Sequence, residues 1–185
     1  MNVGSFSAID VARRVLRSAA VGSLATVTAE GMPFASLVTV ATAPAGEPIL
    51  LLSALAQHTR NLDDDRRASL LLVAPGGARG DPLAGARLTL TGTVGPKMAD
   101  PAIRRRFIAR HPEAAAYADF ADFAFYCLEI ARGHLVAGFG RIVPLSAVDI
   151  LIDVSGAETL IAAEEDLLAE LNSVHAEVLR ACANV

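Results

Sequence analysis

The chain has 185 residues, enough for one domain with a small appendage, and 53% of them are apolar, which allows a sizeable core. Its net charge of −4 and scattered basic residues argue against a general nucleic-acid surface and against an anionic-membrane surface. No apolar run approaches the roughly 18 residues of a membrane-spanning helix, and no signal peptide is expected, because no basic region precedes an apolar stretch.

The chain contains two cysteines, Cys127 and Cys182, and they lack the CxxC spacing that is typical of metal or redox sites. We therefore expect neither a disulfide nor a metal cluster of His and Cys. A reducing, cytoplasmic location fits this pattern.

The first half of the chain predicts a helix followed by strands. Residues 7–19 carry an apolar stripe at helical spacing behind Ser7, which can cap the helix. Residues 22–28 and 35–41 alternate as strands and flank the turn residues Glu30 and Gly31, so they predict a hairpin. Apolar strands are expected at 49–52 and 68–73, with a turn and a short helix between them.

The second half predicts a β-prone strand at 87–94 and a helix at 100–110 with Pro101 in its first turn. A short helix is expected over 112–118. Strand-like runs follow at 123–130 and 134–138, and Arg132-Gly133 could turn between them. A last helix is expected over 163–181, with acidic residues in its first turn.

About six short antiparallel strands with interspersed helices predict a mainly β protein with helices, in the α+β class. The expected architecture is a small antiparallel barrel with a C-terminal helix. No GxGxxG motif follows a strand, so a Rossmann nucleotide site is not supported.

The turn and helix between the strands at 49–52 and 68–73 are rich in hydrogen-bond donors. Free backbone N–H groups at a helix start, together with such side chains, suit an anion and most simply a phosphate. The alternative is an ordinary helix between strands, with three consecutive aspartates at 63–65 as its solvated face. The donor side chains are Ser53, His58, Thr59, Arg60, Asn61 and Arg67.

Four segments carry a resemblance to a known superfamily. They are 52–62 (LSALAQHTRNL), 67–72 (RASLLL), 81–83 with 87–92 (DPL and RLTLTG), and 110–123 with 138–140 (RHPEAAAYADFADF and GFG). Together these segments resemble the pyridoxamine 5′-phosphate oxidase-like, FMN-binding split-barrel superfamily, and within it the haem-utilisation branch.

The resemblance implies a split β-barrel that dimerises, with a flavin in the groove between subunits. It assigns residues 1–150 to the FMN-binding barrel and residues 151–185 to a C-terminal helical extension, the truncated start of the extra domain of haem-utilisation proteins. His58 falls where the oxidases carry a phosphate-binding lysine, Ser36 where they carry an arginine, and Arg87 where they carry a glutamine near the flavin ring.

A flavin site follows from this mapping. Its phosphate would be held by four side chains, with Arg67 or Arg87 supplying charge, and Ser36 and Leu37 would present backbone groups to the ring system. The four phosphate residues would be Ser53, His58, Thr59 and Asn61.

The segment 170–175 (ELNSVH) resembles the His-Met-Asn-x-x-His start of the extra domain in haem-utilisation relatives. His175 matches the second histidine, a haem-iron ligand in that branch. Asp122 and Glu170 are candidates for the carboxylate that orients a ligating imidazole. The alternative is a packed histidine, because His175 lies on an apolar helical stripe.

Three functions follow as hypotheses. The first is an FMN-binding protein, a flavin-dependent oxidoreductase related to pyridoxamine 5′-phosphate oxidase. The second is a haem-binding or haem-degrading protein with haem at the dimer groove. The third is a non-enzymatic dimer that binds a small anionic ligand or no ligand. A homodimer is expected in every version, with a flavin or haem as the small-molecule ligand of the first two. Neither nucleic acid nor membrane is an expected partner.

Overall fold

The computed structural model describes residues 6–74, 84–96, 100–138 and 140–183. Two segments of the resemblance, 81–83 and residue 139, lie outside these residues. The chain divides into two compact units, Met1–Ile152 and Asp153–Val185. No helix in the described part is both long and apolar enough to cross a bilayer.

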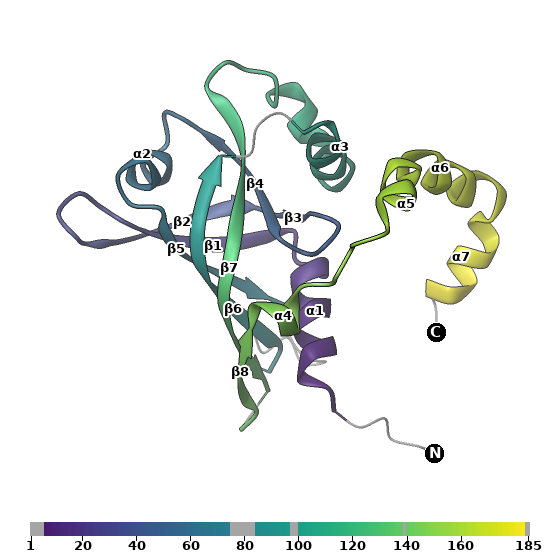
Figure 1. The fold of residues 1–185 in the computed structure, drawn as a ribbon, viewed down its shortest axis with the longest axis horizontal. Coiled ribbons are helices and arrows are strands. Elements are labelled where there is room, and N and C mark those ends of the chain that lie inside the picture. Colours follow the sequence, from purple (N-terminus) through teal and green to yellow (C-terminus); the bar gives the residue numbers. More distant parts are fainter. Residues whose placement is uncertain (1–5, 75–83, 97–99, 139, 184–185) are drawn as a thin grey trace. The chain divides into compact units, whose positions relative to one another are not determined.

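The first unit is built on one curled antiparallel sheet of eight strands, which together form a half-barrel (Figure 1). The strands run in the order β2-β1-β5-β6-β7-β4-β3, and β8 pairs with β7. This confirms the predicted α+β class. The strands are β1 (Val21–Val27), β2 (Pro33–Thr39), β3 (Ala41–Thr42), β4 (Pro48–Ser53), β5 (Arg67–Val73), β6 (Ala86–Pro96), β7 (Phe123–Ala137) and β8 (Ile142–Ser146).

Aliphatic side chains fill the inner face of the sheet. Leu24, Leu70 and Leu90 lie side by side on β1, β5 and β6, and all three are fully buried. Alternate residues on these strands point inward because successive side chains of a strand leave opposite faces. Each buried leucine contributes about 2 kcal/mol relative to exposure, so the period-two pattern fixes which face becomes the core.

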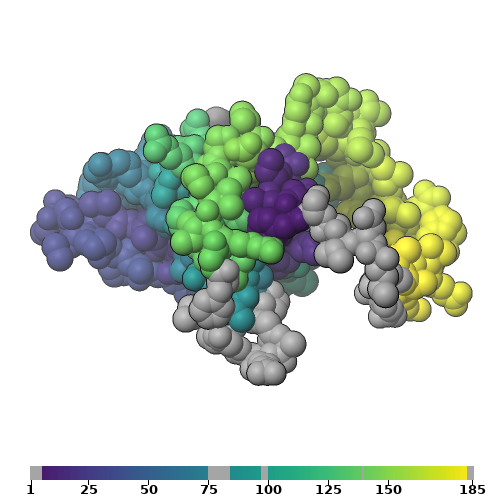
Figure 2. All heavy atoms as spheres, turned by 90° about the horizontal axis from the view of Figure 1, so that it is seen from below, coloured from purple at the N-terminus to yellow at the C-terminus, as the bar shows by residue number. Residues whose placement is uncertain are grey.

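Helix α1 (Ala8–Ser18) begins where the sequence predicts, with the Ser7 hydroxyl accepting a hydrogen bond of 3.2 Å from the Asp10 N–H. Its apolar stripe packs into the main core. The Arg13 guanidinium donates to the carbonyls of Ile150 and Leu151, at 3.1 and 2.9 Å. These bonds tie α1 to α4 (Ala147–Ile150), and Figure 2 shows the purple α1 against the green segment that contains α4.

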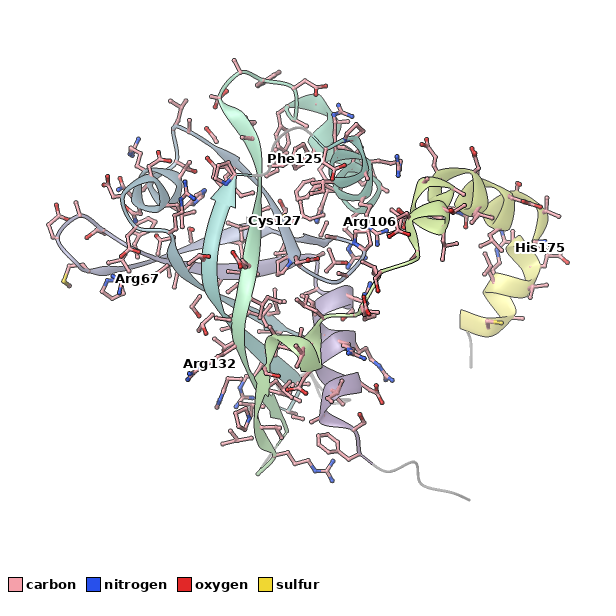
Figure 3. The ribbon with its side chains drawn as sticks, viewed as in Figure 1. Arg67, Arg106, Phe125, Cys127, Arg132 and His175 are labelled. Carbon is pink, nitrogen blue, oxygen red and sulfur yellow. The ribbon has the colours of Figure 1, made fainter. Side chains whose placement is uncertain are left out.

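A second, smaller core lies on the outer face of β4 and β7. Helix α3 (Pro101–Arg110) and the 3₁₀ helix η1 (Pro112–Ala116) cover it. Phe107 of α3 is fully buried, and its ring centre lies 5.5 Å from that of Phe125. Phe125 and Cys127 follow each other along β7 (Figure 3). The predicted helices at 100–110 and 112–118 are therefore present, the second as a 3₁₀ turn.

The predicted turn at Arg132-Gly133 is wrong, because β7 runs unbroken from Phe123 to Ala137. Gly133 serves a close approach instead. A Cβ at this position would lie 2.5 Å from the Cδ1 of Ile150 in α4. The glycine thus lets α4 pack against the strand.

The second unit contains α5 (Glu158–Ala162), α6 (Glu164–Val174) and α7 (Ala176–Ala183). The single helix predicted over 163–181 is wrong, because it breaks at His175, whose backbone (φ −112°, ψ 17°) leaves the helical region. None of the side chains described in this unit is buried. Its apolar stripe includes Leu167, Leu168, Leu171, Val174, Val178 and Leu179, all exposed.

Candidate functional site

Helix α2 (Gln57–Asp64) starts directly after β4 and is tied to the end of that strand. Its N-cap, Ala56, has no side chain that could cap the helix. The Thr59 hydroxyl instead donates to the Ser53 carbonyl at 2.7 Å, and the Ala56 N–H donates to the same oxygen at 3.0 Å. Thr59 is buried. Its hydroxyl therefore stabilises the turn, although the sequence assigned it to a phosphate.

Asn61 anchors α2 to the sheet. Its Nδ2 donates to the Thr26 hydroxyl of β1 at 2.9 Å, and its Oδ1 accepts from the Gln57 amide at 2.8 Å. Asn61 and Thr26 are both only 2% exposed. Buried polar groups need such partners, because an unsatisfied one costs about 1–3 kcal/mol.

Ser53 is bonded to a carboxylate. Its hydroxyl donates to Asp122 Oδ2 at 2.6 Å and accepts from the Leu55 N–H at 3.1 Å. Asp122 immediately precedes β7, where Ser53 pairs with Phe123. Sequence reasoning named Asp122 only as a possible partner of a ligating histidine. Its contact with Ser53 spans 69 positions and has no local sequence signal.

Two of the predicted residues are brought together by the fold. Ser36 on β2 and His58 on α2 lie 22 positions apart, and the Ser36 hydroxyl is 3.0 Å from His58 Nδ1. Both residues are half-buried. Burial lowers the pKa of the His58 imidazole below its ordinary 6.5, because the charged form loses hydration. The ring is therefore neutral at pH 7.

Leu37 points away from this pair. Phe34, Ser36 and Val38 share the inward face of β2, whereas Leu37 faces outward and is 76% exposed. It lies opposite Ser23 on β1. Its side chain belongs to the outer surface of the sheet.

Arg67 (labelled in Figure 3) begins β5, and its guanidinium is already paired with Asp65. Its guanidinium donates three hydrogen bonds to the two Asp65 oxygens, the shortest of them 2.5 Å from Nη2 to Oδ2. Hydrogen bonds from Arg67 lower the pKa of the Asp65 carboxyl to about 2. Arg67 is exposed, and much of its charge is balanced by Asp65.

Arg87 lies at the far end of the same strand pair. It stands opposite Val73, whereas Arg67 stands opposite Thr93. Six residues of strand separate the two ends, which is about 20 Å. Within one chain, Arg67 and Arg87 cannot contact the same phosphate.

His175 lies at the junction of α6 and α7 and is exposed (Figure 3). The backbone N–H of His175 donates to the Leu171 carbonyl at 3.1 Å. Glu170 lies five residues earlier, so the two side chains leave the helix about 140° apart. That separation argues against Glu170 as its orienting carboxylate.

Two cavities among the described residues are lined by other side chains than these. The larger, about 380 Å³, lies between α3 and the start of β7, and the Arg104–Asp119 ion pair of 2.7 Å is on its wall. The smaller, about 260 Å³, lies beside β6 and β7. Its lining includes Glu47, Arg66, Thr93, Gly95 and Glu129.

The geometry of the sheet and of α2 can be compared with known proteins. A model of the CREG beta-barrel family matches residues 6–149. The chain belongs to this family. The family is a split barrel of the pyridoxamine 5′-phosphate oxidase-like superfamily, so the predicted superfamily is confirmed.

Individual relatives of this family member include two haem proteins. The non-canonical heme oxygenase HOZ, chloroplastic, of Arabidopsis thaliana is 35% identical over 136 residues, which are 71% of this chain and 41% of HOZ. The chain thus spans less than half the length of that relative. A heme binding protein from Mycobacterium smegmatis is 40% identical, with a TM-score of 0.74 over 80% of this chain and 61% of the other.

A third relative is structurally more similar to this chain than the Mycobacterium protein is. The protein Atu2129 from Agrobacterium tumefaciens, of unknown function, is 32% identical and has a TM-score of 0.80. The alignment covers 92% of this chain and 71% of that one.

Proposed function

We propose that this protein binds haem. The observation that carries the proposal is the similarity of the barrel, over 71% and 80% of this chain, to two relatives whose names state haem. The chemistry of the Ser36–His58 pair supports it. A neutral imidazole is a ligand for iron, whereas a phosphate calls for a cation or for free donors.

The same residues give FMN binding little support. Ser53 donates to the Asp122 carboxylate, Arg67 is paired with Asp65, and Thr59 and Asn61 are buried with partners. A carboxylate at the predicted phosphate stretch repels an anion. FMN binding and flavin-dependent oxidoreduction therefore stay predictions from the resemblance, ranked behind haem.

The residues present fit haem in their chemistry. Haem asks a protein for an imidazole nitrogen and for apolar surface against its ring. Leu55 precedes α2, three residues before His58 in the sequence, and is 74% exposed. When bound, haem supplies the redox and oxygen chemistry. The side chains of this chain would hold the haem and orient it.

His175 stays a proposed iron ligand, taken from its match to the haem-utilisation branch. Replacing His175 with Ala is expected to change the haem absorption spectrum if this match holds. An unchanged spectrum and affinity would remove His175 from the site.

A homodimer is part of the proposal. The sheet carries a row of aligned residues on its outer face, Leu37, Ser23, Leu71 and Thr89, across four strands. Val21 and Val73 are also exposed nearby on β1 and β5. Exposed apolar side chains gathered on one face are typical of an interface.

Haem degradation is the second candidate function, favoured by the name of the Arabidopsis relative. Haem-loaded protein supplied with a reductant and oxygen should lose its Soret band faster than free haem does. A Soret band that decays at the rate of free haem would leave haem binding alone. The cytoplasmic location stays a prediction, since the name of the Arabidopsis relative contains the word "chloroplastic".

The direct test is a titration of the purified, untagged full chain with hemin and, separately, with FMN. Haem binding predicts a shifted Soret band that saturates at a fixed ratio of haem to protein. The fluorescence of added FMN is expected to stay unquenched, because on this proposal the protein does not bind it. Saturable flavin quenching without a Soret shift would reverse the ranking of the two cofactors.

A further inference from the structure

One nitrogen of the His58 imidazole lies within hydrogen-bond distance of a partner, and the other does not. Nδ1 lies 3.0 Å from the Ser36 hydroxyl. Nε2 has no hydrogen-bond partner among the described residues. It is also not one of the buried polar atoms of those residues that are left without a partner. It therefore reaches solvent. The ring is held at one side and open at the other.

The Ser36 hydroxyl can set which nitrogen carries the proton. Its oxygen also lies 3.5 Å from the Leu24 carbonyl on the neighbouring strand. A carbonyl only accepts, so the serine proton points to it when this bond forms, and the serine oxygen then accepts from Nδ1–H. That arrangement leaves the lone pair on Nε2.

We propose that His58 Nε2 is the nitrogen that the barrel offers to haem iron, and that Ser36 is the positioning residue that fixes the ring and its tautomer. This assignment rests on the proposed haem function and deepens it. A ligating imidazole characteristically donates its other N–H to a nearby acceptor, which orients the ring and raises its basicity. Ser36 is that acceptor.

The other histidines of the barrel are less suited. The chain has four histidines in all. His111 is buried, with Nε2 at 3.0 Å from the Val40 carbonyl and Nδ1 at 3.6 Å from Glu113 Oε1, so polar atoms face both of its nitrogens. His134 lies exposed on the outer face of β7, opposite Thr89, and no hydrogen bond among the described residues orients its ring. Judged by the contacts among the described residues, His58 alone of these three histidines combines a fixed nitrogen with a free one.

The burial of His58 agrees with this role. The residue is half-buried, and a neutral imidazole is the form that ligates a metal.

The test is a hemin titration of the full chain, followed by absorption and electron paramagnetic resonance. His58→Ala is expected to lose the imidazole-ligated spectrum, and added free imidazole should restore it. Ser36→Ala should weaken haem affinity roughly 10-fold to 100-fold, as loss of an orienting partner does. Ser36→Thr keeps the hydroxyl and should stay near the unmodified chain. His134→Ala is the matched control and should keep the imidazole-ligated spectrum.

The outcomes separate the assignment from the proposed function. If the unmodified chain fails to bind haem, both are overturned. If it binds haem and His58→Ala keeps the same spectrum and affinity, only the assignment to His58 is overturned, whatever His175→Ala does.

A haem-free measurement guards against misfolded variants. Nitrogen-15 NMR of the unmodified chain should find His58 as the Nδ1–H tautomer, with that preference lost in Ser36→Ala. An Nε2–H tautomer in the unmodified chain would overturn the role of Ser36.

Discussion

Asn61 and Thr26 form a buried side-chain pair, joined by a 2.9 Å hydrogen bond that links α2 to β1 across 35 positions. Both residues are buried, and the side-chain oxygen of Asn61, Oδ1, accepts a hydrogen bond from the Gln57 side-chain amide. Asn61 thus stabilises the fold through buried hydrogen bonds, and it also belongs to the predicted site.

We expect Asn61→Ala to lower the free energy of unfolding by about 1–3 kcal/mol, because it leaves the Thr26 hydroxyl buried without its partner. Urea denaturation measures this loss. Thr26→Val should cost a similar amount, and the double variant should cost less than the sum. A stable Asn61→Ala protein with weakened ligand binding would instead make Asn61 a binding residue.

Two glycines on β6 make a matched pair of substitutions. A Cβ at Gly92 would lie 1.9 Å from the Glu129 carbonyl oxygen, at the point where the β6–β7 register shifts. A Cβ at Gly95 would meet only the end of the Arg66 side chain, at 3.8 Å. Gly92→Ala should therefore cost about 3 kcal/mol or more, because backbone must move, whereas Gly95→Ala should stay within about 0.5 kcal/mol. Equal melting temperatures for both variants would contradict the register shift at Gly92.

The Asp65–Arg67 pair predicts an unusual titration. The Asp65 pKa of about 2 lies below its ordinary 3.8, because Arg67 donates hydrogen bonds to the carboxylate. The contribution of this pair to stability is therefore present above pH 3.8 and is lost as the pH falls through about 2. Carbon-13 NMR should follow the Asp65 carboxyl to a midpoint near 2, and Arg67→Ala should raise it toward 3.8. A midpoint unmoved by Arg67→Ala would show that another group lowers it.

The proposed dimer can be tested on the outer face of the sheet. Leu71→Glu places a charge among exposed apolar side chains on β5, and burying an unpaired charge at an interface is costly. Light scattering at micromolar concentration should find the unmodified chain at twice its monomer mass, and Leu71→Glu at about half of that value.

Val148→Glu is the control for this charge, since Val148 of α4 is 82% exposed and lies apart from the row on the sheet. It should keep the dimer mass. A monomeric unmodified chain would remove the homodimer from the proposal, and an equal effect of both variants would move the interface elsewhere.

Much of the barrel is predictable from sequence because its signals are local. Ser7 caps α1, and alternation on β1 and β5 gives the buried leucines of the core. The turn at Arg132-Gly133 fails for a physical reason. A glycine that permits a close approach by α4 and a glycine that permits a turn look the same in sequence. The break at His175 was missed because the helical apolar stripe continues through it.

Local residue patterns are enough to predict the class of fold, the order of most strands and helices, and the set of polar side chains between β4 and β5, since each depends on neighbours within a few residues. The hydrogen-bond partners of those polar side chains become clear from the three-dimensional fold. Thr59 and Asn61 turn inward, Ser53 meets Asp122, Arg67 pairs with Asp65, and His58 meets Ser36. Most of these contacts join segments far apart in the chain, and a curled sheet brings such segments together through its overall register, which no short stretch of sequence encodes.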